Sequence, residues 1–492
     1  MQLAVGEGAG GHVGALLVLD TPPEFDVAAA GRVLGARVCA VPRLRQRLYR
    51  APPGCGRPYW ADDPRFDARS HIRQVRCPPP GDERALLNLA AAELVKPLPS
   101  SRPLWSAIFV TGLADGGTGL LVVVNHVLAD GVAGLAVLAA LLDAPDHSGT
   151  DRGLDAADHS GTDRGQGAPD LTRRGQGALH LTGRGQGTIG TADNSKMRDF
   201  PVPPPGLRAL AADAWAGRAR ILAPPLGGLR RLRQGLAELG ARPPRRLAPT
   251  SLNQPTGAQR RLDVVSADLA TVREVAHAHG GTVNDLVLGV VAGALADLLA
   301  SRGELLREVT VSVPVSARRA TGTGQLGNQI GVMPVTVPAD GDLGARVRRI
   351  GVITRQRKSQ ARGASAALFV PGFRLLARAG VLRWYFDHQR RVHTFVTNLS
   401  GPAEPVTFSG APVRAVIAVP ATTGNVTVTI AVLSYAGTVR VTVLSDPARV
   451  PDAPVLVAAL RRALSAAAVV RDGTLVLPTG TSSAVSSRGG PG

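Results

Sequence analysis

The chain has 492 residues, 44% of them hydrophobic, which is enough for two packed domains. Basic residues outnumber acidic ones by 56 to 37, but aromatic residues make up only 3%, and no RNA-binding aromatic motif or zinc-finger spacing occurs. Nucleic acid is therefore not expected as a partner.

The cysteines, Cys39, Cys55 and Cys77, form no CxxC pair, so we expect neither a disulfide framework nor a metal site. No secretory signal is visible in Met1–Gly11, and we expect a cytoplasmic protein.

The first 145 residues predict a mixed domain of strands and helices. Alternating or continuous apolar residues predict strands, and apolar residues at helical spacing predict helices. The expected strands are His12–Asp20, Phe66–Val75, Ser106–Thr111 and Gly119–His126, and the expected helices are Val27–Cys39, Asp82–Leu94 and the apolar stretch after Gly131. We interpret residues 1–145 as an N-terminal domain.

The middle of the chain has little apolar content to bury. Residues 146–200 repeat the string HSGTDRG, and later RGQG, with many glycines, which predicts a disordered insert. Residues 201–250 are an Arg-rich helical connector. Nine arginines face two acidic residues over 206–246, and twelve basic residues face one acidic residue over 343–391. Such stretches attract anionic lipid or coenzyme A phosphates, although solvated helix faces explain any single arginine equally well.

Ordered patterns return over residues 251–478, which we interpret as a C-terminal domain, followed by a disordered tail at 479–492. The pattern predicts strands at Arg261–Val265, Val309–Val315 and Gly331–Val337, a hairpin of Thr427–Leu433 with Thr438–Leu444, and helices at Ala267–His279, Val283–Ala300 and Pro454–Ala467. Strands and helices in both halves predict two layered domains of the α/β (α+β) class.

The segment Asn125-His126-Val-Leu-Ala-Asp130-Gly131 carries the clearest chemical signal. It follows a buried strand and precedes a helix, so His126 projects from a rigid strand end. The unperturbed pKa of histidine suits proton transfer near neutral pH. Asp130 can fold back to lock the loop, and Gly131 permits backbone geometry that a side chain would forbid. A buried histidine with purely structural contacts is the competing interpretation.

On these residues the chain resembles the bifunctional wax ester synthase/diacylglycerol acyltransferase family, within the chloramphenicol-acetyltransferase-like superfamily. The family motif HHxxxDG is matched by NHVLADG. Further matches follow in family order, among them Arg102-Pro-Leu-Trp105, Ser251-Leu-Asn-Gln-Pro255, Thr282-Val-Asn-Asp-Leu286 and Thr397-Asn-Leu-Ser-Gly-Pro402. The resemblance covers residues 12–478 apart from the insert.

The resemblance implies a two-domain, CoA-dependent acyltransferase fold with the active site at the domain interface. It implies His126 as general base, Asp130 as structural aspartate, and direct acyl transfer from acyl-CoA to diacylglycerol or a long-chain alcohol. Acyl-CoA is then a co-substrate, and neither cofactor nor metal is required. Asn125 replaces the first histidine of the motif and cannot take a proton. Because neighbouring strand residues face opposite ways, only one of the two positions can face the substrate.

Other residues of the motifs carry weaker expectations. Asn284 and Asp285 start the most apolar helix, where helix capping is the first interpretation and a site-supporting role, like that of Asn125 and Gly131, the second. Asn398, Gly401 and Pro402 are expected to shape a turn at the domain junction.

Two alternative functions stay open from the sequence. One is an acyltransferase acting on a secondary-metabolite hydroxyl or amine. The other is a non-catalytic paralogue that binds acyl chains or lipid, suggested by Asn125. The basic stretches suggest peripheral contact with an anionic membrane or lipid droplet, which would place the cytoplasmic protein at the inner membrane or on droplets.

Overall fold

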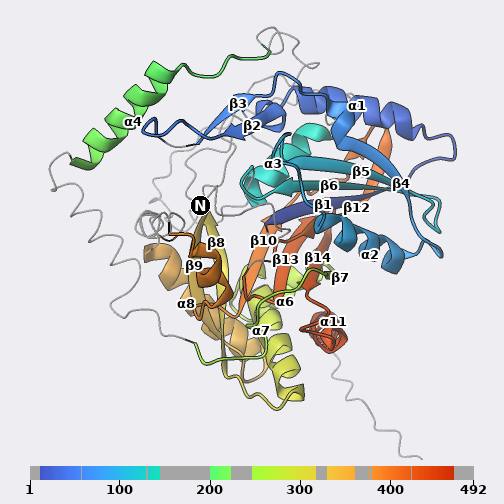
Figure 1. Ribbon diagram of the computed structural model, residues 1–492. Coiled ribbons are helices and arrows are strands. Elements are labelled where there is room, and N and C mark those ends of the chain that lie inside the picture. The colour runs from blue at the N-terminus through green and yellow to red at the C-terminus, as the bar shows by residue number, and fades with distance from the viewer. Residues whose placement is uncertain are drawn as a thin grey trace, which may run out of the picture.

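The computed structural model of the protein describes residues 11–56, 58–128, 131–143, 200–222, 247–316, 330–360, 376, 379–422 and 424–469. Asp130, residues 146–199 of the predicted insert and the predicted tail lie outside the described residues. Two six-stranded sheets, each covered by helices, form the body of the molecule (Figure 1).

The first sheet is built around the strand that begins the described chain. Its order is β11-β12-β1-β6-β5-β4, and every neighbouring pair is antiparallel except β4 with β5. The strands are β1 (His12–Leu19), β4 (Ile72–Arg76), β5 (Trp105–Thr111), β6 (Thr118–Asn125), β11 (Thr407–Phe408) and β12 (Ala411–Val419). The two strands at the β11 edge come from the second half of the chain, a crossover that the sequence did not predict.

The helices of the first half cover both faces of this sheet. Apolar side chains of α1 (Val27–Cys39) and α3 (Gly131–Leu141) form one cluster with residues on one face of the sheet, and those of α2 (Glu83–Leu94) form another on the opposite face. Asp26 and Asp82 cap α1 and α2 by accepting hydrogen bonds from first-turn amides, which explains where these helices begin.

The prediction of a strand over Phe66–Val75 is wrong for the residues before Ile72. The Asp67 carboxylate accepts a hydrogen bond from the Arg69 amide and starts a 3₁₀ turn over Ala68–His71, so β4 begins only at Ile72. A 3₁₀ turn at Pro42–Arg45 and a separate ribbon of β2 (Gln46–Tyr49) and β3 (Tyr59–Asp62) complete the first half.

The second sheet has the order β7-β14-β13-β10-β8-β9. Its strands are β7 (Arg261–Asp268), β8 (Glu308–Ser316), β9 (Ile330–Pro338), β10 (Thr394–Ser400), β13 (Val428–Tyr435) and β14 (Thr438–Ser445). The predicted hairpin is β13–β14. Its turn is the pair Ala436-Gly437, both at positive φ, the geometry that two-residue hairpins require.

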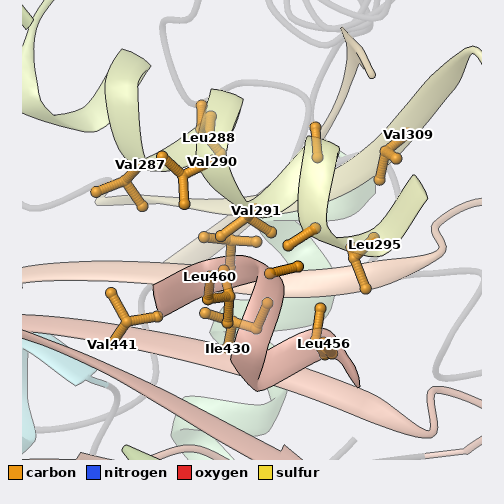
Figure 2. Packing of buried hydrophobic residues seen from close by; sticks show 14 of the residues in the cluster. Val287, Leu288, Val290, Val291, Leu295, Val309, Ile430, Val441, Leu456 and Leu460 are labelled. Carbon is orange, nitrogen blue, oxygen red and sulfur yellow. The ribbon is translucent and has the colours of Figure 1, made fainter. Parts of the chain in front are cut away.

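Helix α7 (Val283–Ser301) forms the centre of the second core. It packs with α11 (Ala453–Val469) and the strands beneath, as Figure 2 shows for Val291, Ile430 and Leu460. Its length and hydropathy would suffice to cross a membrane, but 72% of that stretch is buried inside the protein, as in the core helix of a globular domain. The other described helices of this half are α6 (Leu269–Ala278), α8 (Leu343–Gln360) and α10 (Leu382–Asp387).

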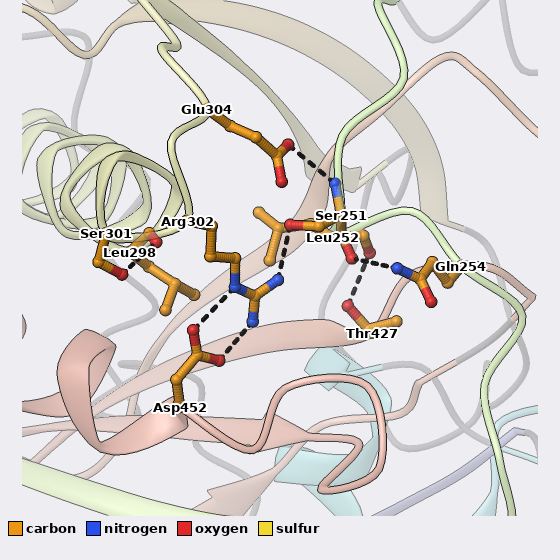
Figure 3. Close-up of polar contacts among 9 residues, drawn as sticks. All are labelled: Ser251, Leu252, Gln254, Leu298, Ser301, Arg302, Glu304, Thr427 and Asp452. Atoms are coloured by element: carbon orange, nitrogen blue, oxygen red, sulfur yellow. Dashed lines mark hydrogen bonds and ion pairs between the residues drawn. The ribbon is translucent and has the colours of Figure 1, made fainter.

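The motif segment that begins at Ser251 is fixed to the end of α7 by hydrogen bonds, and an ion pair links the same helix end to Asp452 (Figure 3). Arg302 makes a two-pronged ion pair with Asp452 and donates to Ser251 Oγ at 2.6 Å. The Ser251 amide donates to Glu304 at 3.0 Å. These contacts give the segment a structural role, closing the second core where α7 and α11 meet.

Helix α4 (Leu207–Leu222) lies apart from both sheets, beside the loop that joins β2 to β3 (Figure 1). Within the predicted Arg-rich connector, Leu207–Leu222 is helical, whereas the described residues 201–206 and 247–250 are not, and residues 223–246 lie outside the described residues.

Candidate active site

His126 directly follows the last residue of β6. Its backbone amide donates to the Gly11 carbonyl at 2.7 Å, which continues the β1–β6 ladder one residue beyond the pair His12–Asn125. The Leu128 amide donates a hydrogen bond to the Asn125 carbonyl at 2.8 Å, which closes a turn. The half-buried His126 thus lies at a strand end, as the sequence predicted.

Asn125 has a local structural task at the same turn. Its side-chain oxygen accepts a hydrogen bond from the Val127 amide at 3.0 Å, the contact of an Asx turn. Its own amide donates to the Leu104 carbonyl at 2.9 Å. Asparagine therefore fixes the direction in which the chain leaves β6.

The two neighbouring positions lie on opposite faces of the sheet. Residues 121 and 123 of β6 belong to the cluster under α2, whereas 120, 122 and 124 belong to the cluster with α1 and α3. By this alternation Asn125 lies on the α2 face, opposite His12, and the ladder position of His126 lies on the α3 face. The α3 cluster also contains Leu433 and Tyr435 of β13. The α2 cluster also reaches the second half, through Leu262 of β7 and Leu444 of β14, so both faces contact it. What distinguishes the face of His126 is that it packs against α3 and the ends of β10 and β13.

Helix α3, which follows the turn, joins the two halves. An apolar seam lies between Leu135 and Leu138 on α3 and Gly401 and Leu433 at the ends of β10 and β13. Its free volume is about 10 Å³, room for one water at most. Gly131 begins α3 as expected, and Asp130 lies outside the described residues, so its locking role stays a prediction.

The Asp285 side chain makes hydrogen bonds that stabilise the start of α7. Its side chain and Thr282 form a reciprocal capping box at the start of α7, with Asp285 Oδ2 accepting from the Thr282 amide at 2.9 Å. Its other oxygen accepts from the Thr354 hydroxyl at 2.7 Å, and the residue is 2% exposed. The capping interpretation accounts for this carboxylate, and a supporting role at the site stays a prediction.

Asn284 has a partner that the sequence did not suggest. Its side-chain oxygen accepts a hydrogen bond from Asn398 at 3.4 Å. Asn398 lies inside β10 and not in a turn, so the expectation that Asn398 shapes a turn was wrong. The strand was not predicted because the polar pair Thr397-Asn398 interrupts its apolar pattern. The contact links two motif asparagines, one at the start of α7 and one on the strand that packs against α3.

Other described histidines of the core are held by structural contacts. Burial lowers the pKa of His12, and a hydrogen bond between its Nδ1 and the Leu94 carbonyl only partly offsets this. His393 Nδ1 accepts from the Thr310 amide at 2.9 Å. Among the described residues no group of three or more His, Cys, Asp or Glu is placed to hold a metal ion.

The comparisons with known proteins agree with this fold. Residues 7–287 match the wax ester synthase/diacylglycerol acyltransferase catalytic domain, and residues 326–467 match the C-terminal domain of the same family. The chain is 27% identical over 456 residues to the probable diacylglycerol O-acyltransferase tgs1 of Mycobacterium tuberculosis, covering 90% of this chain and 88% of that one.

Two solved structures share the architecture. One is the wax ester synthase/diacylglycerol acyltransferase from Marinobacter aquaeolei VT8, with a TM-score of 0.60, 21% identity, and 96% and 98% of the two chains covered. The other is the first condensation domain of the calcium-dependent antibiotic synthetase, with a TM-score of 0.57, 17% identity, and 94% and 92% covered. The expected two-domain acyltransferase fold is confirmed. The chain belongs to the wax ester synthase/diacylglycerol acyltransferase family and is an acyltransferase.

Proposed function

We propose that this acyltransferase moves a fatty acyl group from acyl-CoA to diacylglycerol or a long-chain alcohol, with His126 as the general base. The observation that carries the assignment of the base is the position of His126: a rigid strand end, on the sheet face that packs against α3 and the ends of β10 and β13. His12, on the other face, is 4% exposed and hydrogen-bonded within the first half.

In the proposed reaction the His126 imidazole takes the proton of the acceptor hydroxyl as its oxygen attacks the thioester carbonyl. The new C–O bond forms and gives a tetrahedral oxyanion, which collapses with cleavage of the C–S bond. The departing thiolate of coenzyme A takes the proton back from the imidazolium. Protons and electrons balance without an acyl-enzyme, a metal or a redox partner.

We further propose that the protein works at a lipid surface, as a cytoplasmic enzyme bound peripherally to membrane or lipid droplets. Helix α4 supports this, because it lies at the molecular edge with Leu207 64% and Trp215 68% exposed, alongside arginines. Exposed apolar residues with basic neighbours suit an interfacial helix. Leu207→Gln with Trp215→Gln should weaken binding to vesicles containing anionic lipid, whereas Leu305→Gln, at a 92% exposed position elsewhere, should not.

The reaction is tested by incubating purified protein with labelled palmitoyl-CoA and either diacylglycerol or hexadecanol. His126→Ala should lower turnover about 10²–10⁴-fold, the usual cost of removing a general base, with an unchanged melting temperature. His277→Ala is the matched control, because it removes an exposed histidine at the end of α6. Near wild-type turnover in His126→Ala would exclude the mechanism, and failure of the wild type with both acceptors would exclude the acceptor class.

A further inference from the structure

A second pocket lies on the face of the first sheet opposite to His126. Its volume is about 260 Å³, and it is formed by the loop between α2 and β5, by β4 and β5, and by Val123 of β6. Val123 belongs to the cluster on the α2 face. The proposed acyl transfer makes no use of this pocket.

Three cations line the pocket, and one buried carboxylate positions two of them. Glu93, 7% exposed, pairs with Arg73 and accepts from Lys96 Nζ at 2.7 Å. Burial alone would raise the pKa of Glu93, but hydrogen bonds from Arg73 and Lys96 hold it below its ordinary value, so the carboxylate stays ionised. With Arg102, three positive charges face one negative charge.

A buried histidine adds a directional group. His71 lines the pocket at 6% exposure, stacks on Trp105 with ring centroids 4.4 Å apart, and has Nδ1 2.9 Å from the Trp105 carbonyl. This contact requires the proton on Nδ1, which leaves Nε2 of the neutral ring as an acceptor. This nitrogen can accept from the P–OH group of a monoester monoanion, or donate to an oxygen of the dianion once the ring is protonated.

The loop that carries two of the cations is stiff. Pro97, Pro99 and Pro103 restrict its backbone, and the Arg102 amide donates to the Pro99 carbonyl at 3.1 Å. Cations fixed before binding lose little conformational entropy when an anion arrives. The loop ends in the segment Arg102-Pro-Leu-Trp105, a motif to which the acyl-transfer mechanism gives no part.

We propose that this pocket binds a phosphate monoester. The excess of two positive charges matches a phosphate dianion, and guanidinium groups bind its oxygens in pairs. Leu98, Ile108 and Val123 offer an apolar wall for the esterified group. The volume is slightly below the roughly 300–1,000 Å³ of typical small-molecule sites. It therefore fits one phosphate with a small organic group, either a soluble ester or the head of a phosphatidate lipid.

The site is tested with full-length protein by calorimetric titration with inorganic phosphate and with phenyl phosphate. We expect saturable binding of both, tighter for phenyl phosphate. Lys96→Gln and Arg102→Gln should each weaken binding about 10-fold, the usual loss for a charge-assisted hydrogen bond. Arg383→Gln, which removes a charge from an 88% exposed side chain, is the control and should leave the affinity unchanged.

Flotation with vesicles separates the two sources of phosphate. Binding to phosphatidate vesicles that Arg102→Gln weakens identifies the lipid head group, whereas phenyl phosphate binding without vesicle binding identifies a soluble ester. The proposal is overturned if phosphate and phenyl phosphate give no saturable heat at millimolar concentration, or if the two pocket variants bind as the wild type does. Acyl transfer is not part of the readout, so failure here leaves the proposed reaction untouched.

Discussion

His126 and Asp285 are both polar residues at the junction of two elements, and the fold holds them in different ways. Asp285 is fixed through its side chain, with both carboxylate oxygens hydrogen-bonded to Thr282 and Thr354. The His126 backbone extends the β1–β6 ladder to Gly11. A motif residue whose side chain completes a cap is explained by stability. A backbone contact that extends the ladder sets the position of His126 whatever its side chain is, so stability of the ladder does not explain the choice of histidine there.

Replacing Asp285 gives the largest expected loss of stability. Asp285→Ala removes the capping box and leaves the buried Thr354 hydroxyl without this acceptor, which should lower the free energy of unfolding by about 2–4 kcal/mol. Urea denaturation measures this loss. Asp342→Ala, at an exposed cap where the carboxylate accepts from the Ala345 amide, should cost about 1 kcal/mol. Loss of turnover in Asp285→Ala without loss of stability would instead make Asp285 a site residue.

The buried His393 makes the stability of the folded protein depend on pH. Burial lowers its pKa from 6.5 to about 4, so between these values the unfolded chain takes up a proton that the folded chain does not. Its contribution to stability is therefore complete above pH 6.5 and falls by up to about 3 kcal/mol as the pH approaches 4. His393→Asn keeps an acceptor for the Thr310 amide but cannot titrate. Its stability should fall less between pH 7 and pH 4.5 than that of the wild type, and equal slopes would contradict this account.

The smallest effect is expected at Asn125. Asn125→His loses the Asx hydrogen bond to Val127, which should cost about 1 kcal/mol of stability. Turnover of palmitoyl-CoA should change less than about fivefold, because the new ring lies on the α2 face beside His12. A drop as large as that in His126→Ala would mean that position 125 reaches the substrate.

Much of the fold could be predicted because its elements are strongly periodic. The helix Val27–Cys39 has the predicted ends because Asp26 supplies a cap, and β6 is a continuous apolar run. By contrast, Asn398, Gly401 and Pro402 predict a turn, although Asn398 lies in β10, where polar residues interrupt the apolar pattern of the strand. The pairing of β12 with β1 could not be predicted, since strands some 400 positions apart leave no local signal of their partnership.

The candidate site was predictable as a motif but not as an arrangement. The string around His126 gave the residue and its strand end. The contact of Asn284 with Asn398, and the position of His12 opposite Asn125, depend on pairings between distant segments. Likewise, the resemblance singled out Arg102-Pro-Leu-Trp105, but only the packing of η2 (Ala68–His71) and β5 brings Arg102 and His71 to one pocket.

The central claim is that the base must lie on the α3 face of β6, and exchanging two neighbouring residues tests it most directly. The variant Asn125→His/His126→Asn keeps the composition and moves the imidazole by one position, to the α2 face. Its kcat/KM for palmitoyl-CoA with hexadecanol or diacylglycerol should fall about 10²–10⁴-fold, as in His126→Ala, while the protein stays folded. Near wild-type kcat/KM in the exchanged variant would contradict the account.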